Sequence, residues 1–159
     1  MSTNHQLNSK SLARIAAIQT IYQYETLDRA VNINTLLTNV IDFYKDNDVK
    51  SDHEINDLSN LKLKPSIGYM HELVEFTSNN LVQIDKIIEE HLSSEWTLEK
   101  LPKLLLAILR VSVSEIKYFP ETPRKVVINE YTDIASEMID DSQVGFVNSL
   151  LDKYSEHKG

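Results

Sequence analysis

Apolar residues recur every three or four positions along most of the chain, which predicts helices and not strands. The first predicted helix spans residues 9–26, with Asn8 or Ser9 as its N-cap. Its expected buried face comprises Leu12, Ile15, Ala16, Gln19 and Tyr22. A second helix is predicted over residues 32–46, and its apolar positions are Ile33, Leu36, Leu37, Val40, Ile41 and Tyr44. The polar, aperiodic stretch from Lys45 to Pro65 predicts a loop with room for a short helical turn.

The second half of the chain continues the same periodicity. A long helix is predicted over residues 66–92, followed by one over 101–119 with Pro102 in its first turn. The centre of that helix is apolar nearly all round, which is typical of a helix packed on several sides. Thr122 is the expected N-cap of the next helix, with Pro123 as its first residue. A turn at 140–142 precedes a last helix, so we expect about six helices and an all-α fold.

Length and composition fit one globular domain covering residues 1–159. Of the 159 residues, 42% are apolar and 25% are charged. The absence of cysteine excludes disulfides and thiolate metal sites, and three glycines are too few for a glycine-rich phosphate loop. The longest apolar run has six residues, Leu104 to Leu109, far fewer than the roughly 20 that cross a bilayer. The first eleven residues lack the apolar segment of a secretory signal, so we expect no membrane association and a cytoplasmic location.

No catalytic constellation stands out in the sequence. The five histidines are scattered without metal-ligand spacing, and no G-x-S-x-G elbow is present. The adjacent acids Glu89-Glu90 and Asp140-Asp141 point about 100° apart on a helix, so they do not form an acid–base pair. We therefore expect a protein that is not an enzyme and that holds no metal or cofactor.

The charge distribution leaves one locally basic segment. The net charge is −8, which is the wrong sign for a simple nucleic-acid surface. Before Glu25, however, the chain carries Lys10 and Arg14 and no acidic residue. These cations contact RNA or are ordinary solvated charges. Tyr22 and Phe146 are aromatic side chains that stack an unpaired base or belong to the core.

Two polar interruptions of apolar helices have structural and functional interpretations. Arg110 lies in the most apolar predicted helix, and a buried guanidinium needs a partner. An internal ion pair joining two helices is the favoured interpretation, and a binding role is the alternative. Asn129-Glu130 interrupts another apolar pattern, and we expect the asparagine to bond across a helix contact.

Four ordered motifs resemble the transcription antitermination factor NusB family. The first joins Ala13-Arg14 to Gln19 and Tyr22-Gln23 in the opening helix. The others span residues 107–116, 123–130 and 140–152. The resemblance covers nearly the whole chain in the right order and is strongest over residues 101–152.

This resemblance implies an all-α helical bundle of two three-helix subdomains, an N-terminal lobe over about residues 9–92 and a C-terminal lobe over about 97–157. It implies binding of the single-stranded boxA element in the leader of ribosomal RNA transcripts. It also implies a heterodimer with the small-subunit ribosomal protein called NusE. Together they would join the RNA polymerase antitermination complex.

The resemblance also carries site residues onto this chain. The implied RNA-binding residues are Lys10, Arg14, Tyr22, Asp141, Ser142 and Phe146. The implied partner-binding residues lie on the helix of the C-terminal lobe and are Leu105, Arg110 and Glu115.

Three other hypotheses stay open at this point. A helical protein-interaction adaptor with weak or no RNA binding is favoured by the net charge of −8. The same helical fold precedes the catalytic domain in one group of RNA-modifying methyltransferases, but the missing glycine-rich loop and the short length argue against that activity. A homodimer that masks the RNA face is the third.

Overall fold

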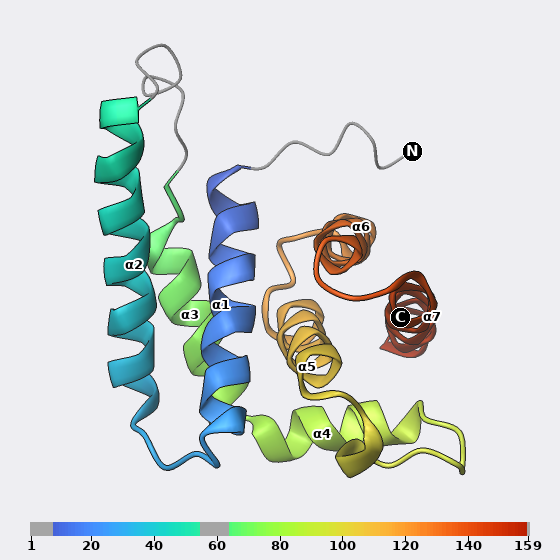
Figure 1. The fold of residues 1–159 in the computed structure, drawn as a ribbon. Coiled ribbons are helices and arrows are strands. Elements are labelled where there is room, and N and C mark those ends of the chain that lie inside the picture. The colour runs from blue at the N-terminus through green and yellow to red at the C-terminus, as the bar shows by residue number, and fades with distance from the viewer. Residues whose placement is uncertain (1–7, 55–63, 159) are drawn as a thin grey trace.

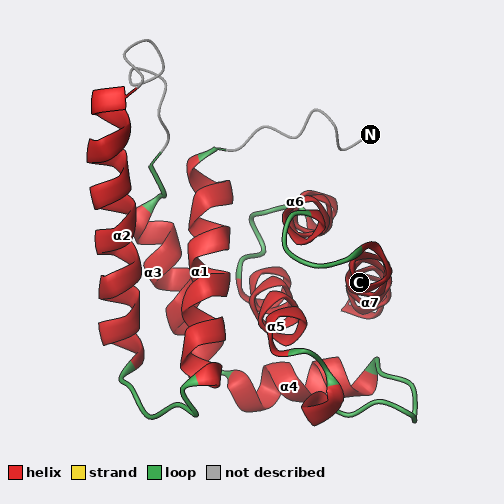
Figure 2. Ribbon diagram, in the orientation of Figure 1, coloured by secondary structure: helices red, strands yellow, loops and turns green. Residues whose placement is uncertain are grey.

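The structure is a computed structural model that describes residues 8–54 and 64–158 (Figures 1 and 2). Within these ranges it is all helical and has no strand, which confirms the predicted fold class. The elements are α1 (Ser9–Thr26), α2 (Ile33–Glu54), α3 (Ile67–Asn79), α4 (Leu81–Glu90), the 3₁₀ turn η3 (Leu98–Lys100), α5 (Lys103–Tyr118), α6 (Arg124–Ser136) and α7 (Asp141–Lys158).

Helix α5 is the centre of the molecule. It contacts α1, α3, α4, α6 and α7, and every residue from Leu105 to Ile116 is buried. This arrangement confirms the prediction of a helix packed on several sides. In Figure 1, α1, α2 and α3 stand side by side, α4 extends from their lower end beneath α5, and α6 and α7 lie on the other side of α5. One hydrophobic cluster runs from α1 to α7, and the division into two lobes stays a prediction.

The helix predicted over residues 66–92 is two helices. It breaks at Asn80, whose φ of −128° and ψ of 29° are not helical. The Asn80 side chain donates to the Phe76 carbonyl at 2.8 Å, and its own carbonyl accepts from the Ile84 amide at 2.9 Å. Asparagine competes in this way with the helical backbone, so it ends α3 and begins α4. The apolar periodicity persists through the break, which is why the pattern alone did not reveal it.

The second helix is longer than predicted. Helix α2 continues to Glu54, so residues 46–54 are helical where a loop was expected. The prediction relied on apolar periodicity, which marks only the part of a helix that packs against a core. Polar residues such as lysine and aspartate can continue a helix beyond that part at a cost of a few tenths of a kcal/mol each. Of the rest of the predicted loop, residues 55–63 lie outside the described residues, and residues 64–65 are not helical.

The buried face of α1 differs from the predicted one. Tyr22 is 37% exposed, and Gln19 is only half-buried. The residues that α1 buries are mostly small: Ser11, Ala13, Arg14, Ala16, Ala17, Ile18, Thr20 and Ile21. Because α2, α3 and α5 all contact α1, close helix approach favours small side chains over the large apolar ones.

The predicted helix starts are nearly correct. The Asn8 carboxamide accepts from the Ser11 amide at 2.8 Å, so Asn8 is the N-cap of α1. At α6 the N-cap residue is Pro123 and the helix begins at Arg124, one residue later than expected.

Candidate nucleic-acid interface

Arg14 lies in the core and not on the surface where the RNA prediction placed it. Its side chain is 3% exposed. The guanidinium donates to both oxygens of Glu115, with Nη2 2.7 Å from Oε2 and Nε 2.9 Å from Oε1. Nη1 lies 3.2 Å from Oε1 of Glu130. The expected RNA contact of Arg14 is corrected to a structural ion pair, because carboxylates from α5 and α6 occupy the guanidinium.

Glu115 is the hub of this buried network. Besides Arg14, it accepts from the Tyr69 hydroxyl at 2.6 Å and from the Tyr131 hydroxyl at 2.7 Å. Its side chain is fully buried, so the expectation that Glu115 contacts a protein partner is also corrected. The network joins α1, α3, α5 and α6 through one carboxylate.

The electrostatics of the network follow from burial and from the Glu115 charge. Burial raises the pKa of Tyr131 well above its ordinary value, and the nearby Glu115 carboxylate raises it further. Burial, followed by the hydrogen bond to Glu115, raises the pKa of Tyr69 to about 12. Burial disfavours the Arg14 cation, but the hydrogen bond and charge of Glu115 outweigh it and raise the Arg14 pKa. At neutral pH both phenols are therefore protonated donors and the guanidinium is charged.

Arg110 forms the internal ion pair that the sequence favoured. Nε and Nη2 bind the two oxygens of Asp85 in α4 at 2.8 and 2.9 Å, and Nη1 binds Glu25 in α1 at 2.9 Å. Burial raises the pKa of Glu25, but hydrogen bonds from Arg29 and Arg110 outweigh this effect and lower it. Arg110 is buried and its donors are taken up by these carboxylates, whereas Leu105 is buried but lines a pocket, so the partner contact expected of Leu105 stays a prediction.

The cross-helix contact expected of Asn129 is made by its neighbour. Asn129 is exposed, whereas Glu130 accepts from the Ser11 hydroxyl at 2.8 Å as well as from Arg14. An asparagine bridge does join α6 and α7, where Asn148 donates to the Thr132 hydroxyl at 3.1 Å. The interruption of the apolar pattern at residues 129–130 therefore predicted a cross-helix contact in the right segment, but Glu130 makes that contact and Asn129 does not.

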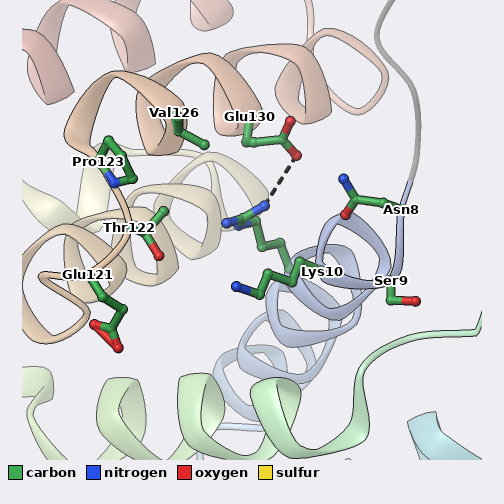
Figure 3. A pocket seen from close by; sticks show the side chains of 9 residues that line it. Asn8, Ser9, Lys10, Glu121, Thr122, Pro123, Val126 and Glu130 are labelled. Atoms are coloured by element: carbon green, nitrogen blue, oxygen red, sulfur yellow. Dashed lines mark hydrogen bonds and ion pairs between the residues drawn. The ribbon is translucent and has the colours of Figure 1, made fainter.

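Lys10 stays exposed at the start of α1. Its ammonium lies 5.0 Å from the centre of the Tyr69 ring, within cation–π range. It borders a polar pocket of about 530 Å³ between the first turns of α1 and α6. Figure 3 shows Lys10 reaching across this pocket, with Glu121 and Glu130 on the other walls. The basic segment predicted at this end is thus reduced to Lys10 among carboxylates.

Tyr22 lies at the opposite end of α1 from Lys10. The 12 intervening helical steps separate the two positions by about 18 Å. Tyr22 borders a pocket of about 330 Å³ whose other lining residues are Gln19, Gln23, Asn39, Val40, Phe43 and Leu104. The ring is therefore partly open to solvent beside a cavity, which favours the binding alternative for Tyr22 over the core alternative.

The start of α7 forms a third part of the predicted site. Asp141 and Ser142 are exposed, and Phe146 is half-buried. Ser142 and Phe146 border a pocket of about 340 Å³ together with Trp96, Lys100, Leu101, Pro102, Leu105 and Gln143. Leu104 lines the Tyr22 pocket and Leu105 lines this one, so the two pockets flank the first turn of α5.

The sequence missed two exposed aromatic residues at these pockets. Phe43 is 57% exposed and Trp96 is 46% exposed. A signal was present for Phe43, because it falls outside the apolar face predicted for residues 32–46. Large aromatic residues off the buried face of a helix merit attention as binding residues.

The described ranges contain no cluster of three or more histidine, aspartate or glutamate side chains arranged to hold a metal ion. Among the helices in these ranges, none combines the length and apolarity required to span a bilayer.

Comparison with solved structures shows the same fold in NusB proteins. A T. maritima NusB structure matches with a TM-score of 0.74 at 20% identity, covering 95% of this chain and 93% of that one. A crystal structure of the antitermination factors NusB and NusE in complex with dsRNA matches with a TM-score of 0.72 at 22% identity, covering 94% and 97%.

Sequence comparison gives closer relatives. The transcription antitermination protein NusB of Rickettsia rickettsii (strain Sheila Smith) is 44% identical over 98% of this chain and 96% of its own length. The NusB of Rickettsia bellii (strain OSU 85-389) is 43% identical over 96% and 93%. The NusB family model matches residues 11–156. With the family model and these relatives both spanning nearly its full length, this chain belongs to the NusB family.

Proposed function

We propose that this chain is a transcription antitermination factor that binds boxA-type single-stranded leader RNA of ribosomal RNA transcripts together with NusE. The observation that carries the proposal is the 44% identity, over 98% of the chain, to proteins named for transcription antitermination. A protein of the same fold has been crystallised with NusE and dsRNA. Such a factor works as a cytoplasmic adaptor within the polymerase complex and needs no catalytic group.

The proposed RNA contacts are Lys10, Tyr22, Asp141, Ser142 and Phe146. Tyr22 and Phe146 border pockets on two flanks of one helical turn, at the start of α5. Lys103 is exposed in that turn, and Lys100 lines the Phe146 pocket. Aromatic side chains beside cations suit unpaired bases and their phosphates.

The proposed role of NusE follows from the scarcity of free cations. Arg14 and Arg110 are both buried and paired with carboxylates, and the chain carries a net charge of −8. Phosphate contacts supply much of the affinity of nucleic-acid binding, so this chain alone should bind RNA weakly. When a partner in the same complex also contacts the RNA, its contact holds the RNA close to this chain. The effective concentration of RNA at the surface of this chain then rises, and the complex binds more tightly than either protein alone.

We expect single-stranded boxA RNA to bind the heterodimer with NusE at least about tenfold more tightly than it binds this chain or NusE alone. Fluorescence anisotropy with each protein, both proteins, and a double-stranded RNA of the same sequence measures this difference. Equal RNA affinity with and without NusE would contradict the proposal.

A protein-interaction adaptor without RNA binding is the second candidate. The burial of Arg14 among carboxylates favours it, because that residue was one of the two cations on which the basic segment depended. RNA affinity that is absent, or that does not change between about 50 and 200 mM salt, would support the adaptor. Light scattering at several concentrations tests whether a homodimer covers either face.

A further inference from the structure

A pocket of about 330 Å³ lies between α1 and α2, with α5 contributing one residue to its lining. Helix α1 supplies Gln19, Tyr22 and Gln23, whose spacing places them on one helical face. Helix α2 supplies Asn39, Val40 and Phe43, and α5 supplies Leu104. Helix α1 thus presents two carboxamides and an aromatic ring to the cavity, and α2 presents one of each.

The lining has an unusual chemistry for this protein. A quarter of the chain is charged, yet none of the seven lining residues carries a charge. Tyr22 and Phe43 expose their rings at its edge, while Val40 is buried. The residues that line the pocket therefore do not repel a negatively charged ligand.

The polar groups of the pocket are available to a ligand. The Tyr44 hydroxyl donates to Oε1 of Gln19 at 3.2 Å, which leaves the Gln19 amide nitrogen to donate elsewhere. Within the described part of the chain, the side chains of Tyr22, Gln23 and Asn39 have no hydrogen-bond partner. The carboxamides of Gln23 and Asn39 each offer both donors and an acceptor, and that of Gln19 offers its donors.

We propose that this pocket binds one unpaired RNA base, which stacks on Tyr22 and Phe43 and is hydrogen-bonded along its edge by the carboxamides. The inference rests on the proposed RNA-binding function and adds Phe43, Asn39, Gln23 and Gln19 to it as a base subsite. Carboxamides match the paired donor and acceptor of a base edge, and aromatic rings stack on any base. Lys103, next to Leu104 in the sequence, is exposed in the same turn of α5.

A base fits this pocket better than a protein segment does. Its volume is near the lower end of the range for small-molecule sites, about 300–1,000 Å³, so it suits one planar group. A docked helix would require an extended apolar groove, whereas this cavity combines two rings with three carboxamides.

The test measures binding of single-stranded boxA RNA of about 12 nucleotides to the heterodimer with NusE, by fluorescence anisotropy. Phe43→Leu and Asn39→Ala alter exposed side chains, so both variants should fold. We expect Phe43→Leu to weaken binding about 5- to 150-fold, the range that loss of one stacked base gives. Phe76→Leu is the matched control, because Phe76 is also an exposed ring with ring neighbours, as Phe43 has in Tyr44, but it lies outside the pocket, against Tyr118 and Phe119 at the far end of α5.

An abasic scan of the RNA separates a base subsite from a general loss of affinity. One abasic position should weaken binding to the unmodified chain but cause little further loss with Phe43→Leu, because the same contact is already missing. Unchanged affinity of Phe43→Leu, or additive losses at every abasic position, would overturn the inference while leaving RNA binding intact. Weaker NusE binding with unchanged RNA affinity would assign the pocket to a protein. Failure of the unmodified heterodimer to bind RNA would overturn the proposed function itself.

Discussion

Replacing Arg14 by methionine is expected to lower the free energy of unfolding by about 3–5 kcal/mol, because it leaves the buried Glu115 carboxylate without its cation. The Tyr69 and Tyr131 hydroxyls would remain as hydrogen-bond donors, but neither supplies a charge. Urea denaturation followed by circular dichroism measures the loss.

Lys10→Met is the matched control for Arg14→Met. Lys10 lies four residues earlier on the same helix and is exposed, so its loss should change stability by less than about 0.5 kcal/mol. At a temperature where the Arg14→Met variant is still folded, that variant should bind RNA with the affinity of the unmodified chain. A folded Arg14→Met variant with near-normal stability and lost RNA binding would show that Arg14 contacts RNA directly.

Replacing Arg110 by methionine is expected to cost about 1–3 kcal/mol, less than the loss expected for Arg14, because its carboxylate partners keep some contact with water. The guanidinium is nearly buried and joins Asp85 of α4 to Glu25 of α1, so its loss leaves Asp85 without this cation and Glu25 with Arg29 alone. The midpoint and slope of urea unfolding give the change in free energy.

Arg29→Met provides an internal comparison, because Arg29 binds the same Glu25 oxygen from the surface. Its side chain is 42% exposed, and exposed ion pairs contribute at most about 1 kcal/mol. Equal losses for Arg29→Met and Arg110→Met would contradict the structural role assigned to Arg110.

Helix α5 shows what the sequence predicts well. A run that is apolar on all sides has to be surrounded, and α5 contacts five other helices. Its one arginine had to be paired internally, which the contacts to Asp85 and Glu25 confirm. These conclusions follow from the cost of desolvation, which depends little on the details of the fold.

Helix α1 shows where sequence patterns fail. Large apolar residues mark a buried face only when the neighbouring helices leave room for them, and α1 instead buries alanines against three helices. Arg14 looked like a surface cation because the partners that neutralise it, Glu115 and Glu130, lie more than 100 positions away along the chain. The break at Asn80 was hidden for a different reason, since the apolar spacing continues through it.

The sequence supplied candidate site residues but not their arrangement in space. Tyr22 is exposed beside a pocket as RNA binding requires, but Lys10 lies about 18 Å away at the other end of α1. Only the folded chain reveals that the Tyr22 and Phe146 pockets flank the start of α5.

The affinity of Tyr22→Ala for single-stranded boxA RNA, measured on the heterodimer with NusE, tests most directly whether this NusB-family chain holds RNA at the aromatic end of α1. Because the ring is partly exposed and its hydroxyl has no hydrogen-bond partner among the described residues, the variant should keep its unfolding free energy within about 1 kcal/mol. RNA binding should weaken by about 1–3 kcal/mol, as expected for one lost stacking contact. Unchanged RNA affinity in a folded variant would contradict the account, and unfolding of the variant would instead assign Tyr22 to the core.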